Sequence, residues 1–176
     1  MTFLTKLPSP LGPLTLASDG EALTGLWLEG QKYYAAGLSP DARERPDLPV
    51  FRRASAWLDA YFTKRDLPPP PPLAPRGSAF RRRVWRLLLE MPYGETGTYG
   101  ALTERLKAAG VPASPQAVGG AVGHNPISIL IPCHRVVGAD GSLTGYAGGV
   151  EKKRFLLELE GADLSKLYMP KRGTAL

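Results

Sequence analysis

The stretch Gly123-His-Asn-Pro-Ile-Ser-Ile-Leu-Ile-Pro-Cys-His-Arg-Val-Val137 gathers the scarcest reactive side chains of the protein. Residues 124–134 hold the only cysteine, the only asparagine and both histidines of a chain of 176 residues. Taken singly, a cysteine is ordinarily a small buried hydrophobic residue, and a histidine beside an apolar run is ordinarily structural. Their concentration in one short stretch indicates a selected site and makes Cys133 the candidate nucleophile.

Thiol chemistry at this position needs a thiolate, and a free thiol with a pKa of about 8.5 requires a base or positive surroundings at neutral pH. The apolar run Ile127–Ile131 predicts a buried strand that Pro132 ends, so Cys133 would stand where the strand turns. The side chains of Cys133 and His134 diverge in any regular structure, so a water or a turn would have to join them. The imidazole would in turn need a carboxylate to fix its tautomer.

Composition narrows the remaining possibilities. The length and the 43% hydrophobic content fit one globular unit or two small ones, and a single cysteine excludes an internal disulfide or a multi-cysteine zinc site. The opening MTFLTKLPSP lacks the features of a signal peptide and no window suits a membrane span, so we expect a cytoplasmic protein, nucleoid-associated if its source is bacterial.

The net charge is unevenly distributed. Residues 1–75 have no net charge, whereas residues 76–176 carry all of the +6. A basic second half predicts a polyanionic partner, nucleic acid first, although ordinary solubility charge gives the same number.

The first part of the chain predicts a small α+β domain over residues 1–67. Short, partly alternating segments at 2–7, 14–18 and 22–28 are typical of an antiparallel meander, and an apolar stripe over 50–62 predicts a helix that covers it. Residues 68–77 form a proline-rich linker, because prolines exclude helix and central strand.

The second part, residues 78–165, predicts a mostly helical domain. Ser78, Thr98 and Ser114 are expected helix caps, and the two short helices that begin near residues 99 and 116 suggest a helix-turn-helix. A further helix is expected over residues 149–160, and a loosely held tail over 166–176.

Together these features resemble a known family. Ile131-Pro-Cys-His-Arg-Val-Val137, with Asn125-Pro126 before it and Gly145-Tyr146 and Glu160-Gly161 after it, closely resembles the O6-alkylguanine-DNA alkyltransferases, which repair DNA by direct reversal. The resemblance implies an α+β fold with an N-terminal ribonuclease-H-like α/β domain and a helical C-terminal domain containing a helix-turn-helix. It also implies a methylated-DNA–protein-cysteine S-methyltransferase, which moves an alkyl group from guanine O6 to its own Cys133 and is consumed in one turnover.

The same resemblance implies a role for each matching residue. Cys133 would accept the alkyl group, His134 would act through a water as the base, and Glu160 would orient His134. Asn125 would brace the turn that carries the nucleophile. The implied substrate-binding residues are Tyr146, which would donate to the flipped base, Tyr99, which would press on the rotating phosphate, Val136, through a main-chain carbonyl nearby, and Lys153, at the pocket edge.

The implied partner is double-stranded DNA containing O6-alkylguanine, bound through its minor groove by a monomer that flips the base out. The expected DNA-contacting residues are Gln116, Ala117, Gly119, Gly120 and Arg135. Small side chains would let the helix approach the groove closely, but they are equally compatible with packing between helices. Where the family usually has an arginine wedge, this chain has Gln116, which lacks the charge and the planar fork, so the efficiency of flipping is in question.

No cofactor and no metal are expected, and the zinc site of some relatives is excluded because residues 1–75 contain neither Cys nor His. Two other functions stay open at this point. The first is an alkyltransferase-like protein that binds lesions without transfer, although such proteins lack the cysteine. The second is a Cys-His hydrolase, which would need an oxyanion hole and repeated turnover. A purely structural role for the cluster is the third interpretation.

Overall fold

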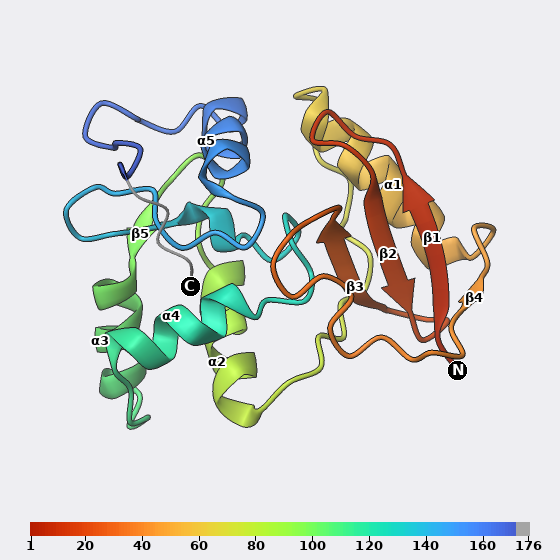
Figure 1. Ribbon diagram of the computed structural model, residues 1–176, viewed down its shortest axis with the longest axis horizontal. Helices are drawn as coiled ribbons and strands as arrows, with labels where there is room; N and C mark the ends of the chain where they lie inside the picture. The colour runs from red at the N-terminus through yellow and green to blue at the C-terminus, as the bar shows by residue number, and fades with distance from the viewer. Residues whose placement is uncertain (172–176) are drawn as a thin grey trace. The chain divides into compact units, whose positions relative to one another are not determined.

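The computed structural model describes residues 1–171 and divides into two compact units (Figure 1). The first unit contains residues 1–76 together with 126–130, and the second contains residues 77–125 and the chain from 131 onward. No helix among the described residues is long and apolar enough to cross a membrane. The two units are described separately below.

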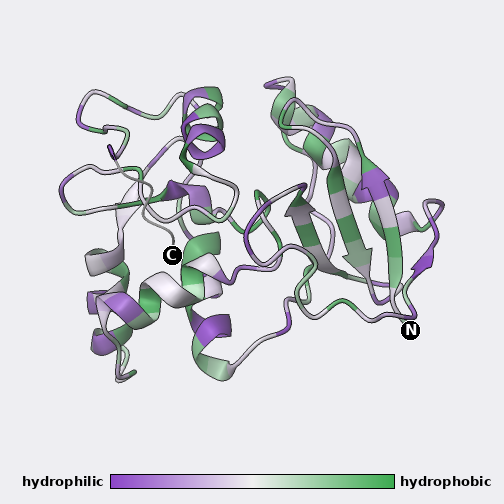
Figure 2. Ribbon diagram, in the orientation of Figure 1, coloured by the Kyte–Doolittle hydropathy of each residue, from purple (hydrophilic) through white to green (hydrophobic). Residues whose placement is uncertain are grey.

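The first unit is a four-stranded sheet with a helix. Its strands are β1 (Phe3–Leu7), β2 (Leu14–Ser18), β3 (Leu23–Leu28) and the short β4 (Arg43–Glu44), in the order β3-β2-β1-β4. The first three strands pair antiparallel as the predicted meander, and β4, which was not expected, runs parallel to β1. Apolar residues run through β2 and β3, as Figure 2 shows, and every residue of β2 is buried.

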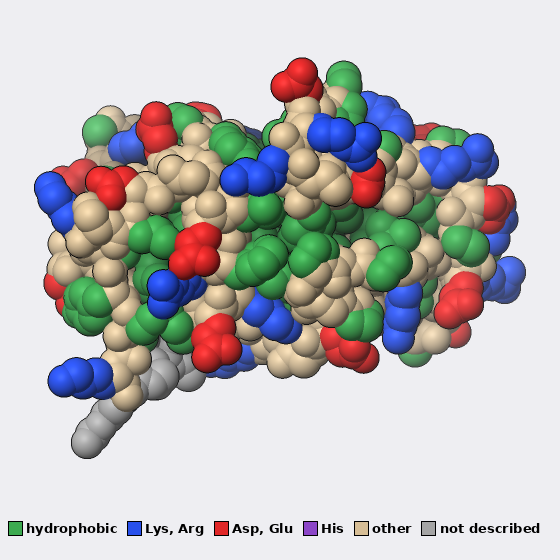
Figure 3. All heavy atoms as spheres, turned by 90° about the horizontal axis from the view of Figure 1, so that it is seen from above, with side chains coloured by type: hydrophobic (Ala, Val, Ile, Leu, Met, Phe, Trp, Pro, Cys, Tyr) green, Lys and Arg blue, Asp and Glu red, His purple; other side chains and the backbone are tan. Residues whose placement is uncertain are grey.

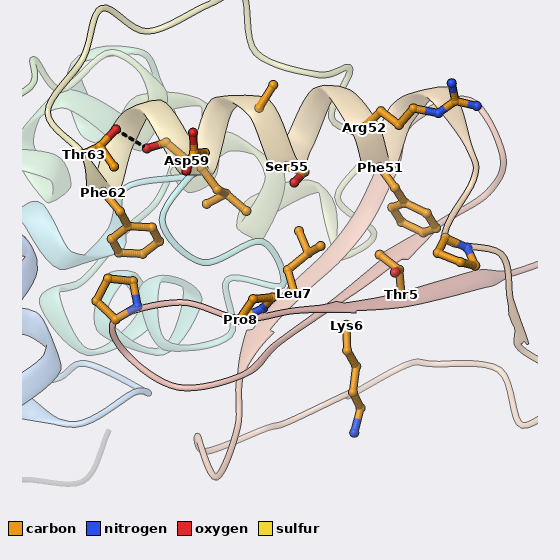
Figure 4. Close-up of a pocket in the computed structure, with 14 residues that line it drawn as sticks. Thr5, Lys6, Leu7, Pro8, Phe51, Arg52, Ser55, Asp59, Phe62 and Thr63 are labelled. Carbon is orange, nitrogen blue, oxygen red and sulfur yellow. Dashed lines mark hydrogen bonds between the residues drawn. The ribbon is translucent and has the colours of Figure 1, made fainter.

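Helix α1 (Pro49–Phe62) begins at a proline, whose missing N–H costs nothing in the first helical turn. Its buried side chains include most of the predicted apolar stripe, such as Phe51, Trp57 and Tyr61, so that prediction is confirmed. A groove between α1 and β1 is lined by apolar and polar side chains, among them Leu7, Phe51 and Phe62 (Figure 4). None of the chemistry-bearing residues of the 124–134 stretch lines it.

Two segments that are distant in sequence form backbone hydrogen bonds with β3 at the edge of the sheet. Leu23 donates its N–H to Pro72 O at 2.8 Å and accepts from Ala74 N–H at 2.7 Å, so the end of the proline-rich segment is an edge partner rather than a free spacer. Leu26 likewise donates to Pro126 O at 2.8 Å and accepts from Ser128 N–H at 3.0 Å. Residues 126–130 therefore belong to the first unit.

The second unit is mostly helical, as predicted. Its helices are α2 (Ala79–Leu89), α3 (Tyr99–Ala108), α4 (Pro115–Gly123) and α5 (Val150–Leu159). The predicted caps are confirmed, because the side-chain oxygens of Ser78, Thr98 and Ser114 each accept the backbone N–H three residues later. The buried Trp85 of α2 donates its indole N–H to Ala121 O at 2.8 Å and so ties α2 to α4.

A two-stranded parallel pair, β5 (Gly97–Thr98) and β6 (Val136–Val137), lies beside these helices. A 3₁₀ turn, Cys133–Arg135, leads directly into β6. The expected loose tail over 166–176 is wrong for residues 167–169, which pack against a loop before α5, while residues 172–176 lie outside the described part of the chain. Basic and acidic side chains are interspersed on the face in Figure 3, so charge alone marks no interface there.

Candidate active site

Tight turns, and not a strand, deliver Cys133 to its position. The predicted strand over Ile127–Ile131 is wrong, because this apolar run is buried in a series of turns. Leu130 donates its N–H to Ser128 O at 2.8 Å around Ile129, which has a φ of +71°. A β-branched residue rarely adopts this conformation, so the backbone is strained here. Cys133 then donates its N–H to Ile131 O at 2.8 Å around Pro132, which forms an inverse γ-turn.

Asn125 braces these turns. Its side-chain amide donates to Ile131 O at 2.8 Å, and the residue is 4% exposed. This bond joins the two ends of the five-residue segment that enters the first unit. The role that the family resemblance implies for Asn125, bracing the turn that carries the nucleophile, is compatible with this position and stays a prediction.

Cys133 is 5% exposed, and its environment acts on the thiol in two directions. Burial raises the pKa of the thiol, because a thiolate loses its hydration there. The Asn125 side chain, the charge of Lys153 and nearby backbone N–H groups oppose this rise in pKa. The site thus holds a protected thiol together with the groups that would support its thiolate.

A buried relay follows Cys133 directly. His134 Nε2 lies 2.7 Å from Glu160 Oε1, and both side chains are completely buried. Burial lowers the pKa of His134, so the imidazole is neutral at pH 7. With Nε2 donating to the carboxylate, Nδ1 is the nitrogen that can accept a proton.

Glu160 is held as a carboxylate from several sides. Arg135 donates to both of its oxygens, at 2.9 and 3.0 Å, and Gly94 N–H donates to Oε2 at 3.2 Å. Burial would raise the pKa of Glu160, but the hydrogen bonds from His134 and Arg135 lower it to about 2. Gly94 must be a glycine, because its φ is +78° and a Cβ would lie 2.9 Å from Glu160 O.

Two polar atoms inside the site have no hydrogen-bond partner among the described residues, His134 Nδ1 and Tyr146 Oη. Most buried polar side-chain atoms are paired, so each such atom requires an explanation. The rings of His134 and Tyr146 meet edge to face, with centroids 6.5 Å apart. The site therefore offers a proton acceptor and a hydroxyl donor close to each other.

The backbone that leads to Tyr146 is anchored at Thr144. Its carbonyl oxygen accepts from Lys153 Nζ at 2.7 Å and from the Tyr99 hydroxyl at 3.1 Å. Burial lowers the pKa of Lys153 to about 8 and raises the pKa of Tyr99. Lys153 is fully buried, and the pocket-edge role that the resemblance implies for it stays a prediction.

Comparison with known proteins identifies the family. Residues 79–162 match the DNA binding domain of 6-O-methylguanine DNA methyltransferase, and residues 3–74 match its ribonuclease-like domain. The methylated-DNA–protein-cysteine methyltransferases of Mycobacterium tuberculosis and Haemophilus influenzae are 46% and 44% identical, over 91% and 90% of this chain and 93% and 86% of theirs. The chain belongs to the O6-methylguanine DNA methyltransferase family.

Solved structures of this family have the same fold. The M. tuberculosis OGT crystallised in complex with DNA is 43% identical, with a TM-score of 0.80 over 90% of this chain and 92% of that one. The O6-methylguanine-DNA methyltransferase of Pyrococcus kodakaraensis is 30% identical, with a TM-score of 0.60 over 92% and 100% of the two chains. The predicted α+β fold, with its small sheet domain and its helical domain, is thereby confirmed.

The second unit brings together most of the residues that the family resemblance assigns to the site. These are Cys133, His134, Glu160, Asn125, Tyr146, Tyr99 and Lys153. Val136 is fully buried in β6, opposite Gly97, and the role of a carbonyl there stays a prediction. Gln116, Ala117 and Gly120 are exposed on α4, and Gly119 is partly exposed.

Arg135 differs from its expected place among the DNA contacts. It is 9% exposed, and besides Glu160 it donates from Nη1 to Met91 O at 2.6 Å. Nε and Nη2 donate to the carboxylate of the relay and neutralise it, while Nη1 donates to a backbone carbonyl. The charge of a residue next to His134 was the one available signal, and nothing local in the sequence names its partner 25 residues away.

Proposed function

We propose that this protein removes alkyl groups from O6 of guanine in DNA by transferring them to Cys133. The observation that carries the proposal is the buried Cys133 beside the His134–Glu160 pair, with His134 Nδ1 unpaired within the described residues. Membership of the methyltransferase family supports the same reaction. The name of the relatives, methylated-DNA–protein-cysteine methyltransferase, describes this transfer in them.

In the proposed reaction the thiol first loses its proton, through a water, to Nδ1 of His134. The sulfur then attacks the alkyl carbon, so that a carbon–sulfur bond forms as the carbon–oxygen bond breaks and the electron pair stays on guanine. His134 then passes the proton that it took from the thiol to the guanine, which leaves as the unmodified base. Glu160 keeps Nε2 protonated and stabilises the transient imidazolium.

The product is a thioether, which the relay cannot hydrolyse because no activated water could displace so poor a leaving group. Each molecule would therefore act once. Tyr146 supplies a buried hydroxyl whose hydrogen bond to the extruded base would replace its missing partner. Extrusion itself costs a few kcal/mol, least for a badly paired lesion.

Helix α4 is the proposed DNA-reading element, entering the minor groove. A Cβ at Gly119 or Gly120 would meet nothing within 4 Å among the described residues, and neither glycine has a positive φ. The glycines therefore serve neither internal packing nor a special backbone conformation, although each weakens the helix by about 1 kcal/mol relative to alanine. Close approach of an external partner accounts for them.

The adjoining α2 exposes three basic side chains that would contact phosphates, Arg82, Arg83 and Arg86.

Gln116 is exposed in the first turn of α4, where it would fill the space that the flipped nucleotide leaves.

We further propose that one copy of the chain acts on each lesion, as a monomer, in the cell compartment that holds the DNA. Size-exclusion chromatography with and without a lesion-containing duplex would test the stoichiometry. A stable dimer without DNA would contradict the monomer.

The deciding experiment mixes the protein with a duplex that carries one O6-methylguanine. Loss of the lesion should stop when one equivalent has reacted per protein molecule. A protein that binds the duplex and leaves the lesion intact would support the binding-only alternative. Sustained multiple-turnover cleavage of an activated ester by Cys133 would support the hydrolase instead.

A further inference from the structure

The loop before Tyr146 is held by a segment that follows the last helix. Leu143 donates its N–H to Tyr168 O at 3.0 Å, and Tyr168 donates its N–H to Gly141 O at 3.0 Å. The Tyr168 hydroxyl also donates to Asp140 Oδ2 at 2.6 Å. Residues 164–169, called the C-terminal strap below, thus bind the loop through main chain and side chain.

Apolar packing reinforces these bonds. Leu143, which is 2% exposed, forms a buried cluster with Val137 and Leu157. The partly buried side chains packed on this cluster include three from the strap, Leu164, Leu167 and Met169. Removing the strap would therefore return the Leu143 side chain to water and free its backbone.

Gly141 is the point of closest approach between loop and strap. Its φ is +88°, and a Cβ built there would lie 2.1 Å from Lys166 O, a backbone atom. Real Cβ atoms do not come so near, so any other residue at position 141 would displace the strap. The glycine is needed for the contact as well as for the turn.

The strapped loop leads directly to the proposed base-binding residue. Thr144, the next residue after Leu143, is held by Lys153 and Tyr99, and two residues later comes Tyr146. The approach to Tyr146 thus has two anchors, the strap at residues 141–143 and the two side chains at Thr144. Without the strap, the whole approach would depend on those two side-chain bonds.

We propose that the C-terminal strap is a positioning element for base recognition, which fixes residues 140–146 so that Tyr146 meets the extruded guanine. The strap lies beyond residue 162, where the match to the family's DNA binding domain ends. This inference rests on the proposed function, because it requires a guanine to enter beside Tyr146. Gly141 and the strap act through Tyr146 and do not touch the reacting atoms.

The test uses free O6-methylguanine base, which removes any contribution from DNA binding, in single-turnover reactions. Two variants disturb the strap, Gly141→Ala and a chain that ends at Ala162. Both should raise the half-saturating base concentration at least about fivefold and leave the limiting rate within about twofold. The pH dependence of the limiting rate should not move, because Cys133, His134 and Glu160 lie outside the strap.

Two controls separate strap displacement from lesser effects. Gly12 has a φ of +91° with nothing within 4 Å of a built Cβ, so Gly12→Ala carries the same backbone penalty without a collision. Tyr168→Phe removes the hydroxyl's hydrogen bonds to Asp140 and Ser142 and keeps both main-chain bonds. Gly12→Ala should keep the wild-type half-saturating concentration, and Tyr168→Phe should raise it less than the two strap variants do.

Wild-type half-saturation in the two strap variants would overturn the inference. So would a shifted pH profile, or a truncated chain that no longer unfolds cooperatively, because the strap would then be part of the general fold. If Gly141→Ala alone fails to fold, the truncated chain decides. A wild-type protein that takes up no alkyl group from base or DNA would instead overturn the proposed function, and this is known before the variants are compared.

Discussion

Arg135 holds Glu160 in a bidentate ion pair, with Nε 2.9 Å from Oε2 and Nη2 3.0 Å from Oε1. The same Oε1 lies 2.7 Å from His134 Nε2. One buried carboxylate therefore orients the imidazole while an arginine keeps it ionised. This arrangement links the stability of the second unit to the protonation state of its relay.

Replacing Glu160 by glutamine should expose that link. In the wild-type protein the pKa of Glu160 is about 2, against 4.5 ordinarily. The carboxylate's contribution to the free energy of unfolding is therefore complete above pH 4.5 and is lost as the pH falls through about 2. The contribution amounts to at most about 3 kcal/mol. Glu160→Gln should lack this acid-sensitive part and be less stable at pH 7 by about 3 to 5 kcal/mol, because Arg135 stays buried without a counter-charge. Urea unfolding at a series of pH values measures both effects.

The matched control is Glu158→Gln, because Glu158 forms an exposed pair with Arg154 on the same helix. It should change the free energy of unfolding by about 0.5 kcal/mol or less. Equal losses in the two variants would contradict the buried ion pair.

Lys153→Met should make the protein more stable and slower. The pKa of Lys153 is lowered from 10.5 to about 8, so keeping it charged opposes folding at pH 7, and wild-type stability should rise relative to the variant between pH 8 and 10.5. The thiolate of Cys133 meanwhile loses a supporting charge, so its pKa rises and the rate profile moves to higher pH. Single-turnover transfer against pH is the measurement. A variant with an unmoved profile would show that Lys153 serves packing alone.

Gly120→Ala should separate folding from DNA binding. Alanine should stabilise α4 by about 1 kcal/mol, because a Cβ at this position meets nothing in the described protein. Affinity for duplex DNA should fall because the added methyl group keeps the helix from the groove, while the reaction with free O6-methylguanine should be unchanged. Thermal melting, fluorescence anisotropy and free-base kinetics measure the three properties. Undiminished duplex binding would remove α4 from the interface.

The sequence predicted the site better than it predicted the path of the chain through it. Cys133 and His134 stood out because their residue types are scarce, which is a signal that survives without any knowledge of fold. The apolar run Ile127–Ile131 indicated burial correctly but not conformation, because hydrophobicity reports which residues leave water and not their φ and ψ. The Arg135–Glu160 pair and the strap at Gly141 depend on contacts between distant residues, for which periodicity and capping rules carry no information.

Gln116→Arg should accelerate repair of duplex DNA. An arginine in the gap left by the flipped nucleotide adds stacking area and a cation near the phosphates. The variant should bind duplex at least as tightly as wild type and react faster with a lesion opposite cytosine. The gain should shrink on a single strand, where little unstacking is required. Equal variant-to-wild-type ratios on both substrates would mean that position 116 does not fill the gap.

The most direct measurement of the central claim is the intact mass of the protein after reaction with an O6-methylguanine duplex, followed by peptide mapping. The account predicts a gain of one methyl group in place of one hydrogen on every active molecule, located on the peptide that contains Cys133. Cys133→Ala should bind the same duplex and keep its mass. An unchanged wild-type mass after the duplex has been bound, or a methyl group found on any other residue, would contradict it.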